Sequence, residues 1–127
     1  SYHGIPKKYF DKGDPYHCYC HKTTRLISEK FSSVKIKTTF QSRFGPQEWL
    51  QPYTDKTLEN LPKEGVKNVL TICPGFASDC VETLEEIQIQ AKESFLNSGG
   101  ENFDMVPCLN DNSDHIILLK SLIERNI

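Results

Sequence analysis

The chain has 127 residues, 37% of them hydrophobic, which is long enough for one domain with a single hydrophobic core. Fifteen basic and 17 acidic side chains give a formal net charge of −2 at pH 7, so the composition offers no bulk attraction to nucleic acid or to an anionic membrane. Because there is no apolar run of membrane-spanning length and no signal-peptide pattern, we expect a soluble protein without a nucleic-acid partner.

The chain opens with SYHGIP, which predicts the last residues of a strand passing into a loop, with the body of the strand missing. Residue 1 is Ser and the only methionine is Met105, so we expect a fragment of a longer protein. His3 would lie at the carboxyl end of this strand. An imidazole there serves either as a hydrogen-bonded loop residue or as a ligand.

A helix is predicted next, with Asp14 as its N-cap and Pro15 at its first position. Its buried face is formed by residues that recur every three to four positions: Tyr16, Cys20, Thr24, Ile27 and Phe31. His17 and His21 are four residues apart and share a face, as a metal-binding pair or as part of an exposed polar surface. No carboxylate stands at a fitting position, which favours the polar surface.

The segment VKIKTTFQS, from Val34, alternates apolar and polar residues and predicts a second strand. The strand enters a loop at Gln41 to Pro46, where the planar guanidinium of Arg43 could hold a carboxylate. Trp49 and Tyr53 add flat apolar surface to this loop. Such side chains suit a flat ligand, or else they pack the loop against the body of the protein.

The next elements alternate between helix and strand. We expect a short helix at Thr54 to Leu61, a strand at Val66 to Cys73, a long helix from Asp79 to Asn97 ended by Ser-Gly-Gly, and a strand at Phe103 to Leu109. Asn112 or Ser113 would cap a last helix, and its core-facing residues would be Ile116, Leu119, Leu122 and Ile123. The order of elements predicts an α/β fold, with a parallel sheet and flanking helices.

The start of the long helix is rich in acids. Asp79 and Glu82 have the spacing of a capping box, which many structural helices use. Glu82 and Glu86 are four residues apart, where like charges repel, so a metal ion, a proton or a basic partner would stabilise the pair. Ligands of parallel sheets bind at the carboxyl ends of the strands, so this helix start, His3 and the Arg43 loop should converge on one site.

Five long motifs cover nearly the whole chain: SYHGIP, KGDPY, TFQSRFGPQEWLQPYTD, CPGFASDCVETLEE and PCLN. Their order and spacing resemble the C-terminal part of bacterial ferrochelatase, the enzyme family that inserts ferrous iron into protoporphyrin IX to form protohaem. The resemblance implies two similar Rossmann-like domains in the complete enzyme, with the porphyrin bound between them. Residues 1–127 would then be an incomplete second domain plus a C-terminal helix, and the N-terminal portion would be its missing partner.

The resemblance also implies roles for individual residues. It assigns catalysis and metal binding to His3 and Glu82, and a proton or metal path to Glu86. The positions that match the porphyrin pocket are Tyr16, Gln41, Ser42, Arg43 and Trp49, with Arg43 as a candidate for binding a propionate. Cys80 stands where animal enzymes have a histidine, so a second imidazole is absent there.

The chemistry of iron insertion suits these residue types. The porphyrin loses two N–H protons as iron enters, and the neutral imidazole of His3 is suited to accept a proton or to contact Fe²⁺. A carboxylate such as Glu82 releases Fe²⁺ more readily than a thiolate would. We expect Fe²⁺ as a substrate and no tightly bound cofactor. An iron–sulfur cluster is not expected, because the chain ends at Ile127 without the cysteine cluster found in some members of the family.

Two other interpretations remain open. The enzyme could insert a metal into a different tetrapyrrole, such as coproporphyrin. Alternatively, the chain could be a non-catalytic binding or assembly module, because without its partner domain it would expose an apolar face through which it could form a homodimer. The chain by itself is expected to be inactive, since half of the porphyrin cleft would be absent. The five cysteines match no disulfide framework or zinc site, which is typical of a cytoplasmic protein: Cys18, Cys20, Cys73, Cys80 and Cys108.

Overall fold

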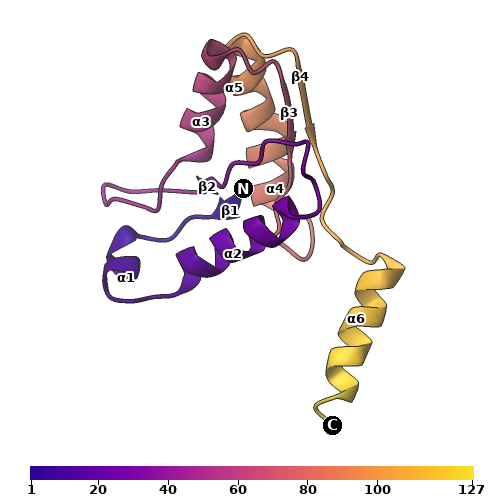
Figure 1. The fold of residues 1–127 in the computed structure, drawn as a ribbon. Helices are drawn as coiled ribbons and strands as arrows, with labels where there is room; N and C mark the ends of the chain where they lie inside the picture. The colour runs from indigo at the N-terminus through magenta and orange to yellow at the C-terminus, as the bar shows by residue number, and fades with distance from the viewer.

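The computed structural model describes residues 1–127 and has an α/β architecture (Figure 1). The strands are β1 (Tyr2–His3), β2 (Phe40–Gln41), β3 (Asn68–Thr71) and β4 (Asn102–Met105). The helices are α1 (Lys7–Asp11), α2 (Tyr16–Ser28), α3 (Thr54–Asn60), α4 (Val81–Leu84), α5 (Lys92–Asn97) and α6 (Ser113–Glu124). A 3₁₀ turn, Leu61–Glu64, follows α3, and a π-helical segment, Glu86–Ala91, connects α4 to α5.

The strands form two parallel pairs, β1 with β2 and β3 with β4. The amino group of Ser1 donates to the carbonyl of Ile72 at 2.7 Å, so the start of β1 lies beside the end of β3. The carboxyl ends of β1, β2 and β3 therefore lie near one another in the middle of the molecule, beside α4 (Figure 1). The predicted α/β fold with parallel strands and flanking helices is confirmed.

Three of the predicted strands are shorter than the sequence pattern suggested, and one of them is β3, which covers Asn68–Thr71 rather than Val66 to Cys73. The segment from Val34 becomes a strand only at Phe40, because residues 34–38 pair with no strand and Val34 is 57% exposed. Thr39 is already buried, and its carbonyl accepts from the Tyr2 N–H at 3.0 Å. β4 ends at Met105, and one more ladder bond joins the N–H of Val106 to the carbonyl of Thr71. Pro107 follows and has no N–H to continue the ladder.

Two groups of buried apolar side chains form the core. The larger one lies between β3, β4 and the π-helical segment with α5, and consists of Leu58, Cys73, Ile87, Ala91, Phe95, Phe103 and Met105. The smaller one packs β1 and β2 against α2, and consists of Tyr2, Cys20, Phe40 and Leu50. Because β2 contributes to the smaller core through Phe40, the adjacent Gln41 is directed to the other face of the strand.

The predicted long helix begins later than expected and is not a single α-helix. Its N-cap is Cys80, and the capping box joins Cys80 to Thr83, whose hydroxyl accepts from the Cys80 N–H at 2.9 Å. The prediction that Asp79 is the N-cap is therefore wrong. The Asp79 carboxylate instead accepts from the Thr83 hydroxyl at 3.0 Å and from the Asn110 side-chain amide at 2.7 Å, which ties the helix start to the loop after β4.

The two other long helices also differ in part from the sequence pattern. α2 ends at Ser28, so Phe31 lies beyond it and is 55% exposed rather than buried. The Asn112 side chain accepts from the Asp114 N–H at 2.9 Å, which confirms the predicted cap of α6. α6 stands away from the rest of the molecule (Figure 1), so the prediction that its apolar residues face the core is wrong: Ile116, Leu119, Leu122 and Ile123 are 42–61% exposed. No helix in the chain has the length and apolar character needed to cross a bilayer.

Candidate functional site

His3 ends β1 and is half-buried, as expected for a residue at the carboxyl end of a strand. Its Nδ1 lies 2.6 Å from the carbonyl oxygen of Gly4, and its own carbonyl accepts from the Tyr16 hydroxyl at 2.8 Å. The Gly4 N–H donates to the Gln41 carbonyl at 2.7 Å, and there is no room for a side chain at Gly4, since a Cβ atom would lie 2.8 Å from that carbonyl oxygen. The backbone at Gly4 is therefore held against β2, while the His3 ring lies beside Phe76, with ring centroids 6.4 Å apart and its Nε2 free of hydrogen bonds.

Glu82 lies in the first turn of α4, close to His3. The pKa of Glu82 is lowered from its ordinary value, first by hydrogen bonding with the Cys80 side chain and with its own backbone N–H, and to a smaller extent by the nearby His3. The carboxylate is thus ionised at neutral pH, beside an imidazole. This pairing of an anionic oxygen ligand with a nitrogen base is the first feature of the candidate site.

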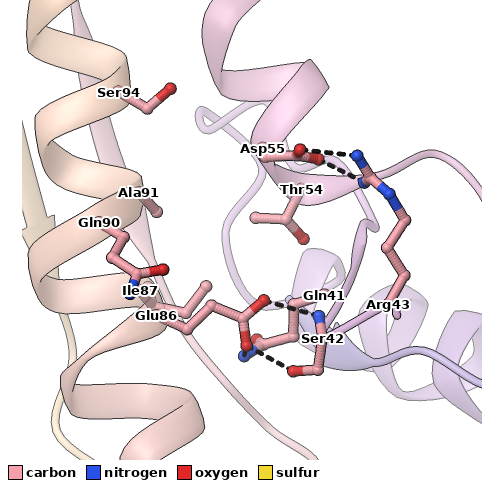
Figure 2. A pocket seen from close by; sticks show the side chains of 10 residues that line it. All are labelled: Gln41, Ser42, Arg43, Thr54, Asp55, Glu86, Ile87, Gln90, Ala91 and Ser94. Atoms are coloured by element: carbon pink, nitrogen blue, oxygen red, sulfur yellow. Dashed lines mark hydrogen bonds and ion pairs between the residues drawn. The ribbon is translucent and has the colours of Figure 1, made fainter. Parts of the chain in front are cut away.

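Glu86 is held by donors from the end of β2 (Figure 2). Ser42 contributes two of them: its N–H donates to Glu86 Oε1 at 2.6 Å, and its hydroxyl donates to Oε2. The side-chain amide of Gln41 donates to the same Oε2 at 3.2 Å and to the carbonyl of Glu82 at 2.6 Å. Gln41 therefore joins the two acidic turns, and these donors stabilise the Glu86 charge that would otherwise repel Glu82.

The amide of Gln41 has one possible orientation in this network. Its Oε1 accepts from the Ser1 hydroxyl at 2.6 Å and from the Cys73 thiol at 3.8 Å, so its NH₂ group must face Glu82 and Glu86. Gln41 is only 3% exposed, and the side chain is satisfied on both of its polar atoms. The reversed amide would direct an oxygen at the Glu86 carboxylate and lose these bonds.

Beside Glu86 lies a polar pocket of about 320 Å³, formed between β2, α3 and the π-helical segment (Figure 2). The pocket is lined by Gln41, Ser42, Arg43, Thr54, Asp55, Glu86, Ile87, Gln90, Ala91 and Ser94. Arg43 closes one side through a bidentate ion pair with Asp55, at 2.7 and 2.8 Å, and its guanidinium lies 4.0 Å from the Tyr53 ring centroid. Burial of Asp55 would raise its pKa, but the hydrogen bonds and charges of Arg43 and Lys56 together outweigh this and lower it.

The two remaining predicted site residues are mainly internal. Trp49 is 5% exposed, its indole N–H donates to the Phe44 carbonyl at 2.9 Å, and its ring lies over Gly4. The exposed aromatic side chain of this loop is Phe44, at 75%. Tyr16 begins α2, and burial together with the neighbouring Cys20 raises the pKa of its hydroxyl, which stays protonated and donates to His3.

The predicted convergence of three loops is therefore present: the ends of β1 and β2 and the start of α4 meet around His3, Glu82 and Glu86. The chain contains no group of three or more His, Cys, Asp or Glu side chains arranged to hold a metal ion. The arrangement can offer one imidazole and one carboxylate to a cation and can accept protons. It lacks the further protein ligands of a closed structural metal centre.

Comparison with known proteins identifies the family. The family model described as ferrochelatase matches residues 1–127. The chain belongs to the ferrochelatase family. It is 57% identical over 129 aligned positions to the ferrochelatase of Rhizobium meliloti (strain 1021), and 57% identical to that of Marinobacter nauticus. A third relative, the ferrochelatase of Pseudoalteromonas atlantica, is 55% identical.

Each of these alignments includes the whole chain but only part of the relative. The chain spans 38% of the Rhizobium meliloti ferrochelatase, 35% of the Marinobacter nauticus ferrochelatase and 36% of the Pseudoalteromonas atlantica ferrochelatase. The family resemblance of the five motifs is thus confirmed over their full length in this chain. The greater part of each relative therefore has no counterpart in this chain.

Sequence reasoning missed several residues that support the site. Asp55 had no signal as the partner of Arg43, because the two are 12 residues apart and lie on different elements. Ser1 and Cys73 bond Gln41 only because β1 and β3 lie side by side, which the sequence does not specify residue by residue. Cys80 carried no signal as an N-cap, because the residues typical of that position are Ser, Thr, Asp and Asn, which favoured the neighbouring Asp79.

Proposed function

We propose that the polypeptide containing this chain inserts Fe²⁺ into protoporphyrin IX, releases two protons and forms protohaem. The observation that carries the proposal is the meeting of His3 with the ionised Glu82 at the carboxyl ends of parallel strands. The names of the 54–57% identical relatives support it independently. Because the chain spans little more than a third of those relatives, we propose that residues 1–127 are the C-terminal part, an incomplete second Rossmann-like domain, and are inactive alone.

In the proposed mechanism His3 accepts a porphyrin N–H proton or contacts Fe²⁺ through its free Nε2. Glu82 is a suitable oxygen ligand for the incoming cation, because its pKa is lowered and it is ionised at neutral pH. Each Fe²⁺ that enters replaces two N–H protons, so the site must remove positive charge. Glu86 is one helical turn farther on and borders the polar pocket, and we propose that it forms part of the path for protons or metal.

The porphyrin-facing roles that we propose follow from the positions around His3. Tyr16 supports the backbone of His3, while Gln41 and Ser42 hold Glu86 beside it. A propionate at Arg43 would have to compete with Asp55, which occupies both terminal nitrogens of the guanidinium. Trp49 forms the packed base of the loop against Gly4, so we propose that it shapes the porphyrin pocket from within.

Iron is proposed as a substrate, with no resident cofactor. The five cysteines are all unpaired thiols, which supports a reducing, cytoplasmic location. The substrates that we propose are Fe²⁺ and protoporphyrin IX, and the proposed intramolecular partner is the remainder of the polypeptide that the relatives contain.

An assembly role is a second candidate function, favoured by the exposed apolar residues of α6. In this alternative the isolated chain pairs with a second copy through α6. Light scattering over a range of concentrations tests this: a mass that rises toward twice the monomer mass supports pairing, and a monomer at every concentration contradicts it.

The decisive experiment is anaerobic Fe²⁺ insertion by the longer polypeptide, followed by the absorbance bands of the porphyrin. We expect His3→Ala and Glu82→Gln to abolish insertion while porphyrin binding, measured by fluorescence quenching, persists. Glu93→Gln, an exposed acid of α5, is the matched control and should retain full activity. Normal turnover in both site variants would contradict the proposal, and a preference for coproporphyrin over protoporphyrin would assign the substrate to the other tetrapyrrole.

A further inference from the structure

Two histidines outside the candidate site form a close pair on α2. His17 and His21 are four residues apart, and their ring centroids are separated by 4.4 Å. None of their four ring nitrogens has a hydrogen-bond partner in the chain, whereas Nδ1 of His3 and Nδ1 of His115 each contact a carbonyl oxygen. Imidazole nitrogens in folded proteins usually bond to protein groups, water or metal ions, so this pair has free donor atoms on one helix face.

The ring of His17 is fixed by aromatic neighbours. It stacks on Phe40, with ring centroids 5.7 Å apart and an angle of 21° between the planes, and the ring of Phe10 lies 4.9 Å away. The imidazole of His17 is therefore held in a defined position beside His21, and imidazole nitrogens are common metal ligands.

We propose that His17 and His21 together bind one divalent transition-metal ion of borderline softness, with Zn²⁺ as the representative. Residues at positions i and i+4 of a helix present their side chains to the same side, the spacing with which paired histidines bind zinc. Imidazole nitrogens prefer Zn²⁺ and its neighbours to Mg²⁺, which requires oxygen ligands. No third His, Cys, Asp or Glu is in place, so water completes the coordination, and the site is open and weaker than a closed four-ligand centre.

This pair is separate from the candidate site. Phe40 and Gln41 are adjacent in β2, so their side chains point to opposite faces of the strand. The ring of Phe40 contacts His17, whereas the amide of Gln41 bonds Glu82 and Glu86. A metal ion at the histidine pair would therefore lie on the far side of β2 from Glu86, and its binding does not require iron insertion.

The test is a Zn²⁺ titration of the ¹⁵N-labelled chain in a His3→Ala background, which removes the histidine of the candidate site. The imidazole resonances of the three remaining histidines, His17, His21 and His115, are followed, and Mg²⁺ is the control ion. We expect Zn²⁺ to shift His17 and His21 together with a stoichiometry of one, and Mg²⁺ to shift neither. His17→Gln and His21→Gln should each weaken Zn²⁺ binding about tenfold or more, since each removes half of the protein ligands.

The matched control is Cys18→Ser, which changes an exposed thiol on the same helix and should leave Zn²⁺ binding unchanged. Circular dichroism checks that α2 is intact in every variant. His21→Gln is less prone than His17→Gln to disturb folding, because His21 is exposed. The proposal is overturned if Zn²⁺ shifts only His115, if His21→Gln binds Zn²⁺ as the parent does, or if Cys18→Ser abolishes binding.

Discussion

The end of α5 offers a sharp test of how tightly the core is packed. The Ser-Gly-Gly sequence ends the helix as predicted, and Gly99 and Gly100 form a Schellman motif there: the Gly100 N–H donates to the carbonyl of Phe95, and the Gly99 N–H donates to that of Leu96, both at 3.0 Å. The two glycines are required for different reasons. Gly99 has a φ of 98°, and Gly100 does not have a positive φ, but its Cα lies against the ring of Phe95.

We expect Gly100→Ala to destabilise the chain more than Gly99→Ala. A Cβ atom at Gly100 would lie no farther than 2.5 Å from three ring carbons of Phe95, which is completely buried and packs against Phe103. Overpacking costs roughly 1–3 kcal/mol, and with no room for the ring to move we expect about 3 kcal/mol. At Gly99 the nearest atoms are 3.9 Å away, so Gly99→Ala costs only the backbone strain, about 1–2 kcal/mol.

Urea denaturation of the single and double variants of a double-mutant cycle measures these changes in the free energy of unfolding. Phe95→Leu removes the ring edge and should cost about 1–2 kcal/mol alone. In the Phe95→Leu background, Gly100→Ala should cost much less stability than it does in the parent, which corresponds to a coupling free energy of about 2 kcal/mol. The cost of Gly99→Ala should be the same in both backgrounds. The reasoning is refuted if Gly100→Ala costs no more than Gly99→Ala, or if Phe95→Leu does not reduce its cost.

Three further predictions concern charges and thiols. The Asp79 pKa is lowered from 3.8, first by its hydrogen bond from Asn110, so its contribution to stability is present above about pH 4 and is lost as pH falls through the lowered pKa. Thermal melts should show Asp79→Asn less stable than the parent at pH 7, with the difference vanishing near pH 2; a constant difference contradicts this. Asp55→Asn should cost only about 0.5–1 kcal/mol, and less in 1 M NaCl, because both partners of the ion pair are partly exposed. Iodoacetamide at pH 8 should label the exposed Cys18 first and leave Cys108 unmodified in the folded chain, since burial and Asp79 raise the pKa of Cys108 to about 12. Equal labelling rates by mass spectrometry would contradict the raised pKa of Cys108.

The sequence predicts features that are set by a few neighbouring residues. The three strand-to-loop junctions, the Asn112 cap and the Ser-Gly-Gly helix end all depend on local backbone preferences, and all are present. Strand length depends instead on a partner, so the alternation from Val34 did not form a strand where no neighbouring strand lies beside it. The spacing of apolar residues in α6 indicates a surface to be covered, but it does not specify which element covers it.

The sequence predicted which segments converge on the candidate site, but not the hydrogen bonds and ion pairs that hold its side chains. Family motifs and the carboxyl-end rule bring His3, Glu82 and Glu86 together, because they depend on topology. The bonds that fix these residues come from distant segments: Asp55 holds Arg43, and Ser1 orients Gln41. Such pairs carry no periodic signal along the chain, so only the folded structure reveals them.

The π-helical segment begins at Glu86, where hydrogen bonds from the end of β2 hold the carboxylate. A regular helix would place the two carboxylates on one face, with a repulsion that costs a few tenths of a kcal/mol. Here α4 ends at Leu84 and the wider turn begins at Glu86, whose carboxylate accepts from Ser42 and Gln41 of the β2 end. π-helical turns cost hydrogen-bond geometry and are frequent at functional sites. The donors to the Glu86 carboxylate come from the end of β2, where Gln41 also donates to the Glu82 carbonyl. The end of β2 therefore positions both acidic residues, and a substitution at Gln41 should displace both of them.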